Sequence, residues 1–124
     1  MSFNRLANVH NRFQNYNTYK RALCVCSAGL LRSPTLAWVL SNEPFNYNTR
    51  AAGADEEYAL IPVDTALITW ADIIVCVNQT VKDTLSAHFD LEGKPVIVLD
   101  IPDRFSYRDD ELVRIISTQM GEVA

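Results

Sequence analysis

The nine residues from Cys26 to Pro34 (CSAGLLRSP) separate a short apolar run from a segment that opens as a helix does. The preceding run, residues 21–25, is apolar after its first residue and predicts a buried strand. Proline is favoured in the first turn of a helix, because the N–H group that it lacks has no partner there. Pro34 therefore marks a helix start. A strand, a tight loop and a helix in this order make the first half of a βαβ unit.

The rest of the chain repeats this alternation of strand and helix. Strands are predicted at residues 23–26, 49–52, 71–77 and 95–99, and helices at residues 33–41, 63–69, 81–89 and 109–119. Strands 23–26 and 71–77 are continuously apolar or nearly so, which is typical of a parallel sheet covered on both faces. The pattern predicts a three-layer α/β/α fold with a mainly parallel four-stranded sheet.

The length of 124 residues fits one domain with a real hydrophobic core. Residues 21–124 are predicted to form that domain. Residues 1–20 form an N-terminal extension, in which Leu6, Val9, Phe13 and Tyr16 fall at helical spacing. This extension is either an amphipathic helix or an arm.

The loop between the first strand and the first helix has the features of an oxyanion site. The unpaired N–H groups and the dipole of a helix N-terminus favour an anion. Small residues allow several loop amides to converge on one point. The planar guanidinium of Arg32 can hold two oxygens of a phosphate at once. The predicted binding residues for phosphate or a similar oxyanion are Arg32 together with Ser27, Ala28, Gly29, Leu30 and Leu31.

Cys26, at the base of this loop, is the candidate nucleophile. The positive field of the helix N-terminus favours the thiolate, which is the nucleophilic form of cysteine. Ser33 can donate a hydrogen bond to that thiolate and so help it leave. The alternative interpretation of Cys26 is a small residue of the core.

The segment after the last predicted strand, residues 99–107, contains the candidate general acids. In open parallel sheets, ligands bind outside the carboxyl ends of the strands, so this segment is expected near Cys26. A phosphocysteine mechanism needs an acid to protonate the leaving oxygen. Asp103, on a loop stiffened by Pro102, is the predicted acid. Asp100 is the alternative, because it stands directly at the strand end.

These motifs resemble those of the low-molecular-weight protein tyrosine phosphatases, and they are closer still to the short bacterial members of that group. Those short relatives carry a Cys-Ser-Ala-x-x-Leu-Arg-Ser-Pro-Thr loop, a Trp-Ala-Asp segment leading into a strand, and a Leu-Asp-Ile-Pro-Asp segment. Here the three motifs stand at residues 26–35, 70–72 and 99–103. The resemblance spans residues 22–118 in a consistent order, and it implies a low-molecular-weight phosphatase-like fold.

The resemblance also implies roles for individual residues. They are Cys26 as nucleophile, Arg32 as phosphate ligand, Ser33 as support for the thiolate, Asp103 as acid and then base, and Phe105 as an aromatic residue lining the substrate pocket. Larger members of the family have a Gly-Asn pair in the loop and often a second loop cysteine. This chain instead carries Gly29, Leu30 and Leu31.

The function implied is a cysteine-dependent protein tyrosine phosphatase, a phosphomonoester hydrolase that acts on phosphotyrosine-containing proteins or small aryl phosphates. No cofactor and no metal are expected, since His10 and His88 have no partners at metal-ligand spacing. Two alternatives stay open. One is a non-catalytic phosphate- or phosphopeptide-binding module. The other is an arsenate reductase, which would need relay cysteines, and Cys24 and Cys76 are poorly placed for that role.

The composition restricts which binding partners and which cellular compartment are expected. The net charge of −4 leaves no broad basic surface, so a nucleic-acid partner is not expected. No apolar stretch approaches the roughly 20 residues that span a membrane, so no membrane partner is expected either. The first twenty residues lack the apolar region of a secretory signal. Three cysteines do not make a disulfide framework. Together these features predict a cytoplasmic protein.

Overall fold

The computed structural model describes residues 20–26, 32–43, 45–54, 62–102 and 109–123. Strands and helices alternate along them as β1 (Arg21–Cys26), α1 (Arg32–Leu40), β2 (Asn48–Gly53), α2 (Thr65–Trp70), β3 (Ile73–Cys76), α3 (Gln79–His88), β4 (Val96–Val98) and α4 (Asp110–Val123). All eight predicted elements are present, and only α4 differs substantially, because it continues past its predicted end at residue 119. The predicted N-terminal extension lies, except for Lys20, outside the described residues.

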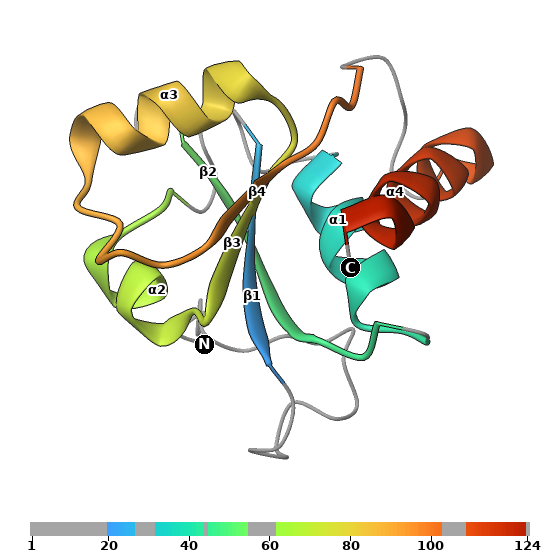
Figure 1. Cartoon of the computed structure of the whole chain (residues 1–124), viewed down its shortest axis with the longest axis horizontal. Helices are drawn as coiled ribbons and strands as arrows, with labels where there is room; N and C mark the ends of the chain where they lie inside the picture. Colours follow the sequence, from blue (N-terminus) through green and yellow to red (C-terminus); the bar gives the residue numbers. More distant parts are fainter. Residues whose placement is uncertain (1–19, 27–31, 44, 55–61, 103–108, 124) are drawn as a thin grey trace, which may run out of the picture.

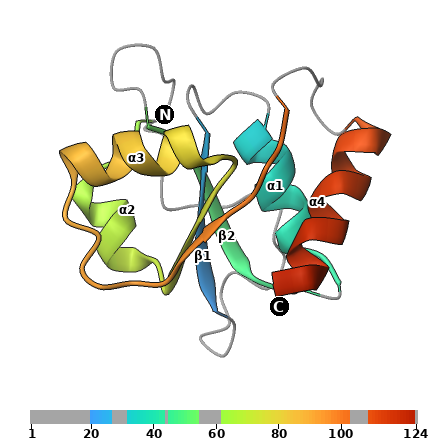
Figure 2. The ribbon, with the colours of Figure 1, turned by 45° about the horizontal axis from the view of Figure 1, so that its top comes forward.

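The four strands form one sheet in the order β2-β1-β3-β4, and every pairing is parallel. The central strand β1 pairs with β2 on one side, where Cys26 stands opposite Gly53, and with β3 on the other, where Val25 stands opposite Cys76. Helices α1 and α4 cover one face of the sheet, and α2 and α3 cover the other (Figure 1, Figure 2). The predicted three-layer α/β/α fold is confirmed.

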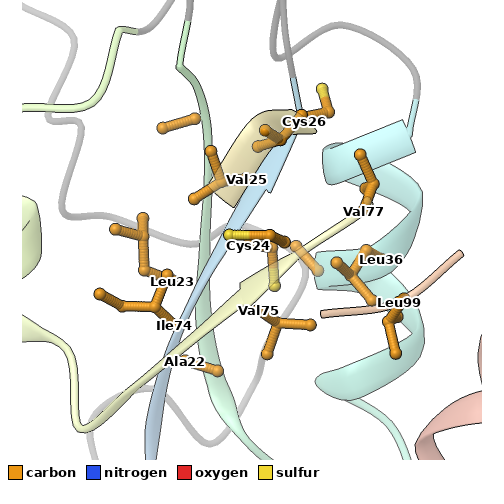
Figure 3. Close-up of a cluster of buried hydrophobic side chains, with 14 of the residues drawn as sticks. Ala22, Leu23, Cys24, Val25, Cys26, Leu36, Ile74, Val75, Val77 and Leu99 are labelled. Carbon is orange, nitrogen blue, oxygen red and sulfur yellow. The ribbon is translucent and has the colours of Figure 1, made fainter. Parts of the chain in front are cut away.

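The core lies on both sides of β1 and β3. Every residue of β3 is buried, and so is every residue of β1 after Arg21. This burial explains the apolar runs in the sequence, since a parallel sheet with helices on both faces exposes neither face. The close-up in Figure 3 shows the resulting cluster, in which side chains of β1 and β3 meet Leu36 of α1 and Leu99 after β4.

Two helices on the second face begin at side-chain caps. The Asp64 carboxylate accepts a hydrogen bond from Leu67 N at 2.9 Å at the start of α2, and the Asn78 side chain accepts one from Val81 N at 2.8 Å at the start of α3. Each cap pairs an N–H group that a helix start would otherwise leave unsatisfied. The caps therefore define where the two helices begin: α2 at Thr65, and α3 at Gln79, shortly after the buried strand β3.

An unusual buried arginine, Arg50, lies on β2 with only 8 % of its surface exposed. Its Nη1 donates to Asn48 Oδ1 and to Thr49 O, both at 2.8 Å, and its guanidinium carbon lies 4.6 Å from the ring centroid of Trp70. Neither acceptor is a carboxylate, and burial lowers the pKa of Arg50 to about 10. The indole ring of Trp70 is therefore a main source of electrostatic stabilisation for this charge.

Candidate active site

The site begins where β1 ends and α1 starts, at the end of the sheet where the parallel strands have their carboxyl termini (Figure 1). The two neighbours of β1 are reached through helices on opposite faces, so the chain reverses its winding direction at this strand. In open α/β sheets such a switch point opens a crevice beyond the carboxyl ends of the strands, and ligands bind in it. Cys26, the last residue of β1, stands at this point.

The thiol of Cys26 is hydrogen-bonded to the hydroxyl of Ser33, with Sγ donating to Oγ over 3.2 Å. Both residues are buried, Cys26 with 3 % and Ser33 with none of its surface exposed. A hydroxyl can either accept or donate, so the same contact can reverse and donate to a thiolate. A hydrogen bond to an ionised partner is roughly twice as strong as a neutral one. Ser33 is therefore placed to stabilise Cys26 in its charged form.

The backbone around Cys26 is held from both sides. Its carbonyl accepts a hydrogen bond from Ala54 N at 2.8 Å, and the carbonyl of Val25 accepts one from Val77 N at 3.0 Å. Both bonds continue the pairing of β1 with its neighbours to the last residue of the strand. The backbone of Cys26 is thus held by the pairing of the strands.

The N-terminus of helix α1 lies at the same carboxyl end of the sheet. It begins at Arg32, and its first turn contains no acidic residue that would offset the positive end of the helix dipole. The hydroxyl of Thr49 donates to Ala37 O at 3.0 Å and ties the helix to β2. The helix direction is therefore fixed relative to the sheet, and its positive end faces the place where Cys26 and Ser33 meet.

The chain after β4 also leaves the sheet at this carboxyl end. Leu99 N donates to Cys76 O at 2.8 Å, and Ile101 N donates to Val77 O at 2.9 Å, so the pairing with β3 extends three residues beyond β4. Figures 1 and 2 both show this segment beside the start of α1. Leu99 and Ile101 are buried, whereas Asp100 is exposed. The residues that lead into the predicted acid loop therefore lie at the same carboxyl end of the sheet as Cys26.

The structure brings Cys26 and Ser33 together and places Asp100 on the segment that approaches them. Arg32 is placed as the first residue of α1. The other predicted site residues lie outside the described part of the chain: Ser27, Ala28, Gly29, Leu30, Leu31, Asp103 and Phe105. Their roles stay predictions.

The other two cysteines, like Cys26, lie on strands of the sheet. Cys24 and Cys76 are fully buried within the sheet, and all three cysteines of the chain are described as thiols without disulfide bonds. Burial raises the pKa of Cys24, and the nearby Cys76 and Cys26 raise it further. Burial also raises the pKa of Cys76 to about 12. Both thiols are held protonated inside the core.

Two further properties concern the described residues alone. Within them, no group of three or more His, Cys, Asp or Glu side chains could hold a metal ion. No helix among them is both long enough and apolar enough to cross a membrane.

No protein-family model and no curated protein matches the chain, but solved structures do. Wzb of Vibrio vulnificus in complex with benzylphosphonate superposes with a TM-score of 0.68 at 18% identity, over 85% of this chain and 97% of that one. A low-molecular-weight phosphotyrosine phosphatase of Vibrio cholerae gives a TM-score of 0.63 at 16% identity, over 84% and 95% of the two chains. The chain has the low-molecular-weight phosphatase fold.

A third solved structure with this fold is the YwlE arginine phosphatase of Geobacillus stearothermophilus. Its TM-score is 0.64 at 21% identity, and the match covers 84% of this chain and 92% of that one. The low-molecular-weight phosphatase fold is therefore present over most of the length of each chain. It is the fold that the loop motif implied.

Proposed function

We propose that this chain is a cysteine-dependent phosphomonoester hydrolase of the low-molecular-weight phosphatase family, with phosphotyrosine as its substrate class. The observation that carries the proposal is the 3.2 Å contact between Cys26 Sγ and Ser33 Oγ, at the switch point of the sheet and beside the start of α1. A nucleophile, a partner for its charge and a helix N-terminus meet there. These are the requirements for nucleophilic attack on a phosphate.

In the first step, the Cys26 thiolate attacks phosphorus in line with the leaving group. An S–P bond forms as the P–O bond to the leaving group breaks. Arg32 and the amides of residues 27–31 bind the three equatorial oxygens, whose charge they stabilise through the transition state. Asp103 donates its proton to the departing phenolate oxygen.

In the second step, water hydrolyses the phosphocysteine. Asp103, now a carboxylate, takes a proton from the attacking water, an O–P bond forms and the S–P bond breaks. Ser33 donates its hydrogen bond to the departing thiolate and lowers the free energy of this leaving group. Inorganic phosphate is released, and the two steps use only groups of the chain and water.

The substrate class rests on the aromatic pocket expected at Phe105 and on the ligand of a protein with the same fold. Wzb of Vibrio vulnificus is bound to benzylphosphonate, a molecule with an aromatic ring and a phosphonate group. A phosphotyrosine-containing protein or a small aryl phosphate is the corresponding partner here. Phosphoarginine is the substrate to test against it, because the YwlE of Geobacillus stearothermophilus is an arginine phosphatase. The acidic composition and the cysteine thiols fit a cytoplasmic enzyme.

The decisive experiment measures hydrolysis of p-nitrophenyl phosphate by the purified chain in the presence of a metal chelator. Turnover is expected, and Cys26→Ser should abolish it. Cys76→Ala is the matched control, because it removes a core thiol and should leave turnover in place. Acid quenching during turnover should trap phosphate on Cys26. Turnover that depends on added metal, or normal rates in Cys26→Ser, would contradict the mechanism.

This assay and a second one with arsenate separate the two alternatives. A non-catalytic phosphate- or phosphopeptide-binding module would bind inorganic phosphate at Cys26 and hydrolyse nothing. An arsenate reductase must pass a disulfide from the nucleophile to other cysteines. Cys24 and Cys76 are fully buried and held protonated, which makes them poor relays. Hydrolysis without arsenate-dependent thiol oxidation supports the phosphatase.

A further inference from the structure

Among the described strands, β4 is the outermost on its side of the sheet, so the residues that follow it have a neighbouring strand on one side only. Leu99 N donates to Cys76 O at the end of β3, and Ile101 N donates to Val77 O directly after it. Backbone groups of successive residues in a strand point to alternate sides, so the N–H and C=O groups of Asp100 face the open edge. Such edge groups need partners that no neighbouring strand supplies.

A single side chain from α4 satisfies both groups. Gln119 Oε1 accepts a hydrogen bond from Asp100 N at 2.7 Å, and Gln119 Nε2 donates one to Asp100 O at 2.9 Å. The amide thus pairs with Asp100 as a residue of an additional strand would. Only an amide side chain offers a donor and an acceptor at this spacing, since a glutamate lacks the donor and a methionine lacks both.

Helix α4 is a firm support for this amide. The neighbouring residues Ile116 and Met120 are completely buried, and α4 packs against α1. Helix α1 in turn carries Ser33, the hydrogen-bond partner of the Cys26 thiol. The pair of helices on this face therefore holds both the nucleophile's partner and the base of the acid loop.

We propose that Gln119 is a positioning residue for the general acid. The inference rests on the proposed function. Leu99 and Ile101 hold the segment against the core and against the chain at the end of β3. Between these two residues, Gln119 holds the two peptide groups that flank Asp100. It thereby sets the direction in which the chain leaves the sheet toward Asp103. The same clamp acts directly on Asp100 if that residue is the acid.

The test compares substrates with different leaving groups, because only a poor leaving group depends on proton donation by the general acid. A poor leaving group such as phenol needs a proton from the general acid, whereas a good one such as 2,4-dinitrophenol does not. In Gln119→Met, kcat/KM for phenyl phosphate should fall by about tenfold or more, which is part of the roughly 10²–10⁴-fold contribution of a general acid. For 2,4-dinitrophenyl phosphate the fall should be less than about threefold. Inhibition by inorganic phosphate should not change.

Gln79→Met is the matched control. Gln79 also lies on a helix, and its amide donates to Asp83 of the same helix at 2.9 Å instead of to the chain after β4. Neither substrate should respond to this change. If Gln119→Met does not fold, Gln119→Glu serves instead, because it keeps the size and the acceptor and replaces the donor with a charged oxygen. The same selective loss on phenyl phosphate is expected.

The outcomes separate the two proposals. If the unchanged chain hydrolyses no aryl phosphate, the proposed function is wrong. If it hydrolyses both substrates and the Gln119 variants lose activity equally on both, or on neither, the positioning role is wrong.

Discussion

The Cys26 thiol and the Ser33 hydroxyl are seven residues apart in the sequence and share a hydrogen bond of 3.2 Å. A thiol is a weak donor, so this bond adds little to stability while Cys26 is neutral. A thiolate is a strong acceptor, so the bond becomes favourable once the sulfur is charged. The buried hydroxyl therefore matters more for the reactivity of Cys26 than for packing.

Replacement of Ser33 by alanine should slow the reaction of Cys26 with iodoacetamide at neutral pH. A hydrogen bond to a charged group contributes about 1.5–3 kcal/mol, which predicts a rate lower by about 10- to 100-fold. Phosphate release from the phosphocysteine should slow as well, because the thiolate leaves less readily. Mass spectrometry of the labelled protein measures the first effect.

Ser41→Ala is the control for that variant. Ser41 is also buried, at the other end of α1, where its hydroxyl donates to Trp38 O at 2.8 Å. This change should lower stability by a similar amount without altering the labelling of Cys26. Equal labelling rates in the Ser33 and Ser41 variants would argue against a role for Ser33 in thiolate stabilisation.

The three cysteines should differ in reactivity within the folded protein. Cys24 and Cys76 are completely buried, and burial raises the pKa of both. Native labelling should therefore reach Cys26 alone, and inorganic phosphate should slow it. In denaturant all three thiols should react. Native modification of Cys76 would show that the core opens more readily than the packing implies.

The fold was predictable because its strands are short apolar runs separated by helix signals. The extension of α4 beyond residue 119 was missed, since Gly121 disfavours a helix. The buried Met120 explains why the helix continues, because packing against the core outweighs propensity. The pairing of Gln119 with Asp100 left no signal in the sequence. It joins residues from two elements, and neither residue type marks such a contact.

The stacking of Arg50 on Trp70 was equally invisible, and it makes a prediction about stability. Arg50→Met and Trp70→Leu should be coupled by about 1–2 kcal/mol, the size of a desolvated cation–π contact at 4.6 Å. Trp70→Leu should thus cost less in the Arg50→Met background than in the unchanged chain. Urea unfolding of the four proteins gives the coupling energy.

Trp38 supplies the control for this cycle. It lies on α1, on the opposite face of the sheet from Trp70 of α2 (Figure 1). Trp38→Leu and Arg50→Met should therefore be additive. A coupling energy near zero for the Trp70 pair would mean that the two neutral acceptors alone satisfy the buried guanidinium.

The Asp72 carboxylate joins the starts of β3 and β1, and it should make stability depend on pH. It accepts hydrogen bonds from Arg21 N at 2.9 Å and from Arg21 Nη2 at 3.3 Å. Partial burial raises the pKa of Asp72, but the hydrogen bonds and the charge of Arg21 outweigh burial and hold that pKa below its usual value. The unfolded chain therefore takes up this proton at a higher pH than the folded one does. The stabilisation is present above the ordinary aspartate pKa of about 4 and is lost as pH falls through the lower folded value.

Asp72→Asn tests this dependence, because it keeps an acceptor for the Arg21 N–H and removes the charge. The pair is largely exposed, so the variant should be less stable than the unchanged chain by less than about 1 kcal/mol at pH 7. The difference should shrink as pH falls below about 4, because the unfolded chain takes up the proton first and the folded chain follows at lower pH. Urea unfolding of both proteins at pH 7, 5 and 3 measures it, and acid effects of other carboxylates cancel in the comparison. A difference that is constant with pH, or that grows in acid, would show that the Asp72 charge does not stabilise the start of the sheet.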